Sequence, residues 1–136
     1  MSIQEKQQEI IDEFIVFDDW MDKYEYIIDL GKELPRIAED KKTPDRIIEG
    51  CQSRVWLDSE FLDNKLVFSA DADAIITKGI IALLIRVLNN ESPENIASAN
   101  LFFIDEIGLK EHLSPTRANG LLSMVNRMKM DAIKRV

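Results

Sequence analysis

The chain has 136 residues, of which 46% are hydrophobic and 31% charged, and its formal net charge is -8. This length and balance predict a single globular domain that spans residues 1–136 and buries one core. The acidic charge argues against a nucleic-acid partner, because phosphate binding normally requires a positive face.

Two helices are predicted in the N-terminal part of the chain. An S-x-x-E capping box begins at Ser2, and apolar residues then recur on one helical face to about Val16. Asp18 or Asp19 can cap a second helix, which we expect Gly31 to end.

A hairpin is predicted in the middle of the chain, after a connecting loop over residues 32–46 that includes a short helical turn. The runs SRVWLDSEF and LVFSAD are rich in β-forming residues and flank a turn at Asp63 and Asn64. Two strands alone are marginally stable. The sheet therefore needs helices against it or a third strand, for which residues 47–48 are the candidate.

A core helix is predicted over residues 74–88, started by Asp71 or Asp73. Its apolar residues cover nearly the whole circumference, as expected of a buried helix. Ser92 and Pro93 then match the cap and first position of another helix.

The C-terminal part of the chain is predicted to be helical. Residues 101–107 form an apolar turn or two closed by Gly108, and Ser114 with Pro115 starts the last helix. One stripe of that helix is expected to face the core: Leu121, Val125, Met128, Ala132 and Val136. The pattern predicts an α+β fold, mostly helical, with a small antiparallel sheet packed against several helices.

Targeting and membrane segments are not visible in the sequence. The first residues, MSIQEKQQEIIDEF, lack an apolar core, and residues 74–88 are too short to span a bilayer. The single cysteine cannot form an internal disulfide, which agrees with a reducing compartment. We therefore expect a cytoplasmic protein without a membrane partner.

Reactive side chains are few, with one cysteine and one histidine. A zinc or iron-sulfur site generally requires three or four such ligands. The usual glycine-rich phosphate loops are also missing. The sequence thus predicts neither a bound metal nor a cofactor.

Cys51 lies in a polar turn, GCQSRVW, just before the first predicted strand. It is either a small apolar side chain buried in the core or an accessible thiol that reacts with another molecule. Gly50 permits unusual backbone angles, while Gln52 and Ser53 supply hydrogen-bond donors near the sulfur. His112 is the only histidine that could act as a base, and we favour a surface or C-terminal helix position for it over that role.

Three sequence blocks, in order, are GCQSRVW, DADAIITKGIIALLIRVL and LKEHLSPTRANGLLSMV. Together they resemble the SufE family of sulfur-acceptor proteins over most of the chain. The resemblance implies a SufE/IscU-like fold and assigns Cys51 as the acceptor. Arg117 matches an arginine of the SPTR block. It lies either near the loop, where its charge could steady a thiolate or persulfide, or in a salt bridge at the N-terminus of the last helix.

The resemblance also implies a function and partners. The protein would take persulfide sulfur from a SufS-like, pyridoxal-phosphate-dependent cysteine desulfurase, which it stimulates, and deliver it to a scaffold complex for iron-sulfur cluster assembly. This describes a sulfur-transfer accessory protein rather than a stand-alone enzyme. The oligomeric state stays open, a homodimer included.

Two alternatives stand beside this interpretation. One is a small thiol enzyme in which His112 deprotonates Cys51. The other is a non-catalytic adaptor of the desulfurase in which Cys51 is incidental. Within the carrier interpretation, we hypothesise that the loop from Gly50 to Ser53 tucks Cys51 inward at rest and swings outward when the desulfurase docks.

Overall fold

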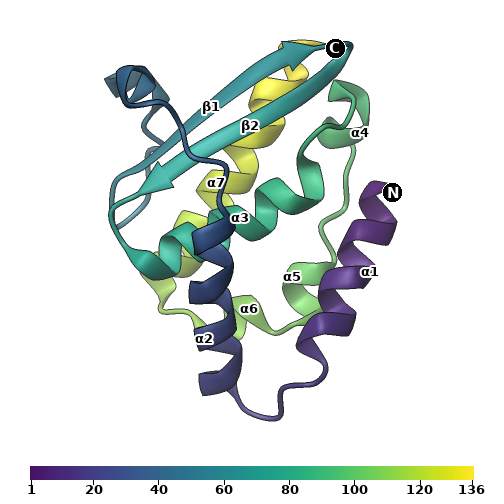
Figure 1. Ribbon diagram of the computed structural model, residues 1–136, viewed down its shortest axis with the longest axis vertical. Helices are drawn as coiled ribbons and strands as arrows, with labels where there is room; N and C mark the ends of the chain where they lie inside the picture. Colours follow the sequence, from purple (N-terminus) through teal and green to yellow (C-terminus); the bar gives the residue numbers. More distant parts are fainter.

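The protein has an α+β architecture in which one β-hairpin packs against a set of helices (Figure 1). The computed structural model describes residues 1–136. Its α-helices are α1 (Ile3–Phe14), α2 (Trp20–Leu30), α3 (Ile75–Leu88), α4 (Pro93–Ala97), α5 (Phe103–Glu106), α6 (Leu109–His112) and α7 (Pro115–Ile133). The strands are β1 (Val55–Leu62) and β2 (Lys65–Ala72), and three 3₁₀ turns precede them: η1 (Gly31–Glu33), η2 (Glu39–Lys41) and η3 (Pro44–Arg46).

The two N-terminal helices begin as predicted. The Ser2 hydroxyl accepts a hydrogen bond from the Glu5 backbone in a capping box, and Asp19 caps α2. The prediction that Gly31 ends α2 is confirmed, and with a φ of -61° the chain continues from this C-cap into η1. Gly31 also lies against α3, where an added Cβ would come within 2.9 Å of the Gly79 nitrogen. Its missing side chain permits this close approach.

The hairpin is confirmed, with β1 and β2 paired antiparallel in full register from Val55 opposite Ala72. Asp63 and Asn64 both have positive φ values, 51° and 64°, as a two-residue type I′ turn requires. No third strand joins the sheet. Ile47 contributes only an isolated antiparallel bridge to β1, so helices cover the hairpin.

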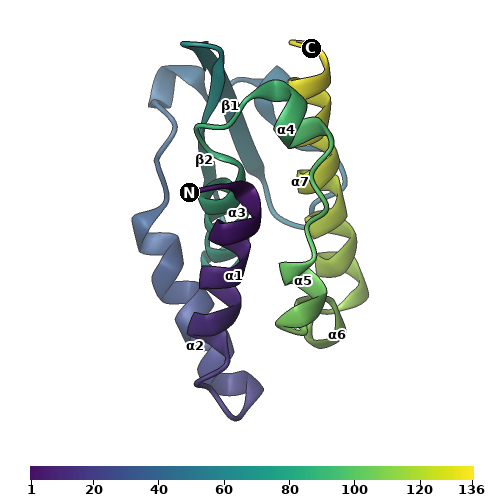
Figure 2. The same cartoon turned by 90° about the vertical axis from the view of Figure 1, so that its right-hand side faces the viewer.

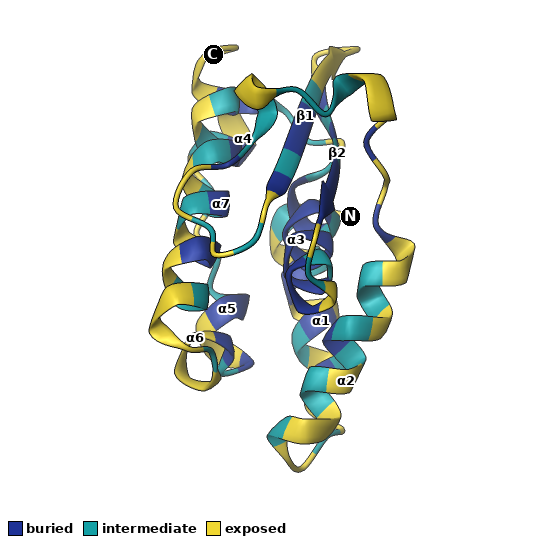
Figure 3. Ribbon diagram, turned by 90° about the vertical axis from the view of Figure 1, so that its left-hand side faces the viewer, coloured by how far each residue is buried: buried dark blue, intermediate teal, exposed yellow.

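Helix α3 is the centre of the core, as its apolar circumference predicted, and 11 of its 14 residues are buried. α2 lies on one side of it and α7 on the other (Figures 2 and 3). The predicted caps Asp71 and Asp73 are wrong, because the N-cap is Ala74 and no side chain caps the first turn. Asp71 is instead a buried residue of β2.

The C-terminal helices start at the predicted serines, since Ser92 and Ser114 each accept a backbone hydrogen bond from the first turn. Most of the predicted α7 stripe is buried, but Val136 lies beyond the helix and is exposed. Met124 joins the buried face although it was not predicted there. No helix combines the length and the apolar character needed to cross a bilayer.

Candidate functional site

Cys51 lies on a loop whose two ends are joined by main-chain contacts, while the residues between them make no main-chain hydrogen bond. The Ile48 N–H donates to the Val55 carbonyl at 2.8 Å, next to the bridge between Ile47 and Trp56. Between these closing contacts, residues 49–53 make no backbone hydrogen bond within the protein. Main-chain bonding therefore does not fix the loop's position.

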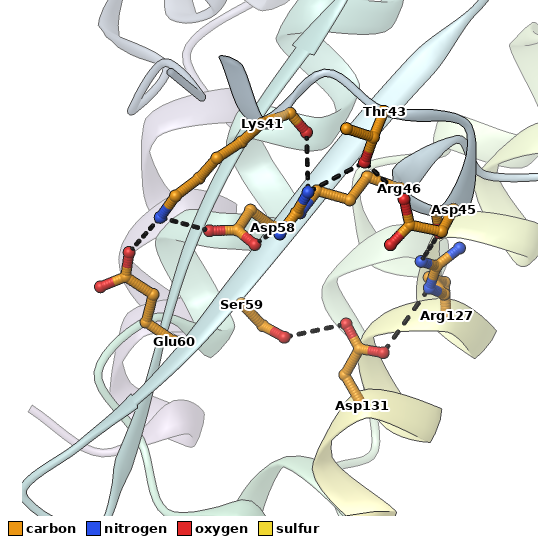
Figure 4. Close-up of polar contacts among 9 residues, drawn as sticks. All are labelled: Lys41, Thr43, Asp45, Arg46, Asp58, Ser59, Glu60, Arg127 and Asp131. Carbon is orange, nitrogen blue, oxygen red and sulfur yellow. Dashed lines mark hydrogen bonds and ion pairs between the residues drawn. The ribbon is translucent and has the colours of Figure 1, made fainter. Parts of the chain in front are cut away.

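The segment that leads into this loop is, by contrast, firmly anchored (Figure 4). The buried Asp58 of β1 accepts a hydrogen bond from Arg46 Nε at 2.9 Å, and Lys41 Nζ lies 3.3 Å from the same carboxylate. From α7, Arg127 donates to the backbone carbonyl of Asp45 at 2.7 Å. These contacts join the segment to both β1 and α7. The segment that precedes the loop is therefore held in place, although the loop itself has no main-chain hydrogen bonds.

The Cys51 sulfur is half-buried against the second turn of α7. Its Sγ lies 3.7 Å from the Gly120 carbonyl, to which the thiol donates a weak hydrogen bond. Burial raises the pKa of the Cys51 thiol, and the exposed side chain of the neighbouring Arg54 makes no hydrogen bond. At neutral pH the resting group is therefore a protonated thiol with low nucleophilicity.

A polar cluster lies beside the sulfur and is centred on Thr77, a buried residue in the first turn of α3. The Thr77 hydroxyl accepts hydrogen bonds from Arg117 Nη1 at 3.1 Å and from Ser53 Oγ at 3.3 Å. All three residues line a cavity of about 10 Å³ with Cys51. Arg117 thus lies near the loop, and its guanidinium is hydrogen-bonded to Thr77 and not to the Cys51 sulfur.

The remaining predicted loop residues differ in their surroundings. Gly50 has a φ of +89°, and a Cβ added there would lie 2.6 Å from Ser123 Oγ of α7. Both facts restrict this position to glycine while the loop rests on α7. Gln52 lines the same cavity but is largely exposed and makes no hydrogen bond.

Comparison with known proteins identifies the family. The family model "SufE: Fe-S metabolism associated domain" matches residues 8–132. The chain belongs to the SufE family. It is 43% identical over 129 residues to an uncharacterized SufE-like protein of Rhizobium etli, covering 91% of this chain and 87% of the relative. A second such protein, from Rhizobium meliloti, is 40% identical over 131 residues, covering 91% and 92% of the two chains.

A solved structure shows the same fold. The solution structure of a hypothetical protein from Thermus thermophilus superposes with a TM-score of 0.78 over 96% of this chain and 95% of that one, at 19% identity. Membership of the SufE family implies a sulfur-acceptor role in Fe-S metabolism and an interaction with a cysteine desulfurase.

The one histidine of this SufE-family chain does not join Cys51. The exposed His112 ring stacks on Trp20 with centroids 4.3 Å apart, and its Nδ1 lies 2.9 Å from the Gly108 carbonyl. It lines no part of the cavity at Cys51. The structure thus lacks the Cys and His pair that a thiol enzyme would use.

Three residues of the site were not singled out in the sequence: Thr77, Ser123 and Met124. They come from α3 and α7, and each has an ordinary helical role in its local pattern. Only the packing of the loop between these helices gives them a second role.

Proposed function

We propose that Cys51 accepts a sulfur atom from the persulfide of a pyridoxal-phosphate-dependent cysteine desulfurase and carries it toward iron-sulfur cluster assembly. One observation supports this most directly: the only thiol sits half-buried on a loop without main-chain hydrogen bonds, and the segment that precedes this loop is held in place. Such a loop can present the sulfur to a docked partner without unfolding the domain.

The chemistry is a thiol exchange that needs no external oxidant or reductant. The Cys51 thiolate attacks the outer sulfur of the donor persulfide, and a new S–S bond forms on Cys51. The donor's own S–S bond breaks, and its cysteine leaves as a thiolate that takes up the proton lost by Cys51. The products are a Cys51 persulfide and a free donor thiol.

Exchange at this site requires movement of the loop. The raised pKa of Cys51 and its contact with Gly120 both disfavour attack at rest. These same features shield the thiol from oxidants and other thiols between encounters. Docking of the desulfurase draws the loop away from α7, which hydrates the sulfur and increases its thiolate fraction.

Arg117 has a second role once sulfur is bound. A persulfide is more acidic than a thiol and is carried as an anion. Arg117 Nη1 lies 3.1 Å from Thr77 Oγ1 in the cavity that Cys51 lines. When the loop returns, this guanidinium is the cation available to stabilise the charge.

Transfer to Cys51 also accounts for stimulation of the desulfurase and for downstream delivery. Removal of the outer sulfur frees the donor cysteine for another turnover. The Cys51 persulfide is then passed to an iron-sulfur scaffold complex by a second exchange of the same kind. Neither step requires a cofactor on this chain.

The test is an incubation of the protein with a cysteine desulfurase, its pyridoxal phosphate and free cysteine. Intact mass spectrometry should show one added sulfur atom that dithiothreitol removes, and none in the Cys51→Ser variant. Absence of the adduct with an active desulfurase contradicts the carrier function. The His112→Ala variant serves as control and should form the adduct as the parent does.

The Cys51→Ser variant also separates the carrier from the adaptor. A carrier stimulates the desulfurase by removing sulfur, so this variant should leave desulfurase turnover at its basal rate. Stimulation equal to that of the parent would mean that docking alone activates the desulfurase.

A further inference from the structure

A groove with a positive lining lies between the α2–η1 junction and the first turn of α3. It has a volume of about 290 Å³. Three of its lining residues are cations, Lys32, Arg36 and Lys78, and no lining residue is acidic. We call it the basic groove. It stands out because the chain as a whole carries a net charge of -8.

The carboxylates near the basic groove leave it an excess of positive charge. Asp71 is buried and lies 3.4 Å from Arg36, 3.7 Å from Lys78 and 2.7 Å from Lys42, so its one negative charge is shared among three cations. Asp29 pairs with Lys32 at 3.3 Å, but both side chains are largely exposed and the pair is weak. The side chain of Arg36 is 67% exposed and can turn toward a ligand.

The basic groove also has an apolar part. Ile75, the first residue of α3, is 62% exposed, and it lines the groove with Ile28 and the buried Leu34. In the chain leaving α2, the buried Leu34 and Ile37 are separated by exposed residues (Figure 3). An exposed isoleucine among cations favours a partner with apolar and acidic side chains together.

The first turn of α3 connects the basic groove to the Cys51 site. Ile75 and Lys78 face the groove, while Thr77 and Ile80 line the cavity at Cys51 on the other side of the helix. An α-helix with its side chains is about 10–12 Å wide. A typical interface covers about 800 Å² on each partner, so one partner can cover both sites.

We propose that the basic groove docks an acidic, amphipathic segment of the desulfurase, and this rests on the proposed function. Carboxylates of that segment oppose Lys32 and Arg36, and an aliphatic side chain packs on Ile75. The partner thereby grips one side of the first turn of α3 and has access to Cys51 on the other. The charge complementarity speeds encounter with the partner and orients it.

Two variants test the basic groove with little risk to the fold, because both side chains are exposed: Lys32→Glu and Ile75→Ser. Binding to the desulfurase should weaken about tenfold for each, measured as Kd by fluorescence anisotropy. The Lys32→Glu variant should also lose part of the salt dependence of binding. The matched controls Lys65→Glu and Ile133→Ser change residues elsewhere that are also exposed, and they should bind as the parent does.

Sulfur uptake by the parent, measured as the Cys51 adduct, separates this inference from the proposed function. If the parent gains sulfur and both groove variants bind as tightly as the parent, the docking inference is overturned and the carrier function stands. A second outcome is that the parent binds the desulfurase but gains no sulfur, and that the groove variants bind weakly. In that case the docking inference is supported and the carrier function is contradicted. If the parent does not bind the desulfurase, both fall.

Discussion

On the proposed carrier function, Cys51 combines two opposing needs in one side chain. A carrier thiol must react with its donor, yet it must resist other reagents while it waits. Contact with Gly120 and burial against α7 satisfy the second need, and they raise the pKa of Cys51. Because no main-chain hydrogen bond holds residues 49–53, we propose that a small movement of the loop meets the first need.

Gly50 is expected to control where this loop rests. In Gly50→Ala, the positive φ costs about 1–2 kcal/mol, and the new Cβ collides with Ser123 Oγ. The loop should move off α7, so iodoacetamide should alkylate Cys51 several times faster, while sulfur uptake from the desulfurase should fall because the added side chain restricts the hinge on which ordered presentation of Cys51 depends. The melting temperature should fall by only a few degrees, as about 1–2 kcal/mol predicts.

A double variant separates the two causes at Gly50. Adding Ser123→Ala removes the hydroxyl but not the backbone strain, so alkylation should return part of the way toward the parent rate. Equal rates in the single and double variants would show that Ser123 is not the obstacle. Unchanged sulfur uptake in Gly50→Ala would count against a hinge at this position.

At the level of elements, α3 links the core to the site. Its central turns are buried on all sides, so the helix cannot shift without disturbing the whole domain. Its first turn, free of a side-chain cap, places Thr77 between the Cys51 loop and α7. Thr77 is therefore the fixed point against which Ser53 and Arg117 are held.

The Thr77→Val substitution keeps the side-chain shape and removes the hydroxyl that holds Ser53 and Arg117. Loss of about 1 kcal/mol of hydrogen bonding to the loop should raise Cys51 alkylation about fivefold. Thr43→Val is a matched control, since the Thr43 hydroxyl also accepts a bond from an arginine, Arg46, at 2.9 Å. If both variants are alkylated at the parent rate, Thr77 does not restrain the loop.

Across the whole molecule, one buried carboxylate joins the irregular segment 31–46 to the sheet and to α3. Asp71 is 5% exposed and lies 2.7 Å from Lys42 Nζ. Burial alone would raise the pKa of Asp71. Hydrogen bonds from Lys42 and the Ala72 N–H, together with the charge of Lys78, lower it from 3.8 to about 2.

Asp71 should therefore stabilise the fold in a pH-dependent way. Because its pKa is lower in the folded protein, its stabilisation is complete above pH 4 and disappears as the pH falls through about 2. Asp71→Asn should reduce the free energy of unfolding by about 2 kcal/mol at pH 7, measured by urea denaturation. The difference should shrink steadily below pH 4; a gap that persists at pH 2 would assign the loss to packing instead of charge.

The elements that could be predicted from sequence are those set by local rules. Capping at Ser2, Ser92 and Ser114 depends on residues within one turn, and the Asp63–Asn64 turn depends on two residues. The error at Asp71 has a tertiary cause. An aspartate just before a helix is a familiar cap, but a contact with the distant Lys42 determines what Asp71 does.

The sequence by itself determined the α+β class, the buried α3 and the single thiol at the start of a strand. These follow from periodicity, turn chemistry and residue counts, which need no knowledge of distant contacts. Only the tertiary structure decided that Thr77, Ser123 and Arg117 surround the loop, that His112 stacks on Trp20, and that three cations share one groove. The physical reason is that such neighbours are chosen by how helices pack around a common core, and packing acts between residues far apart in the chain.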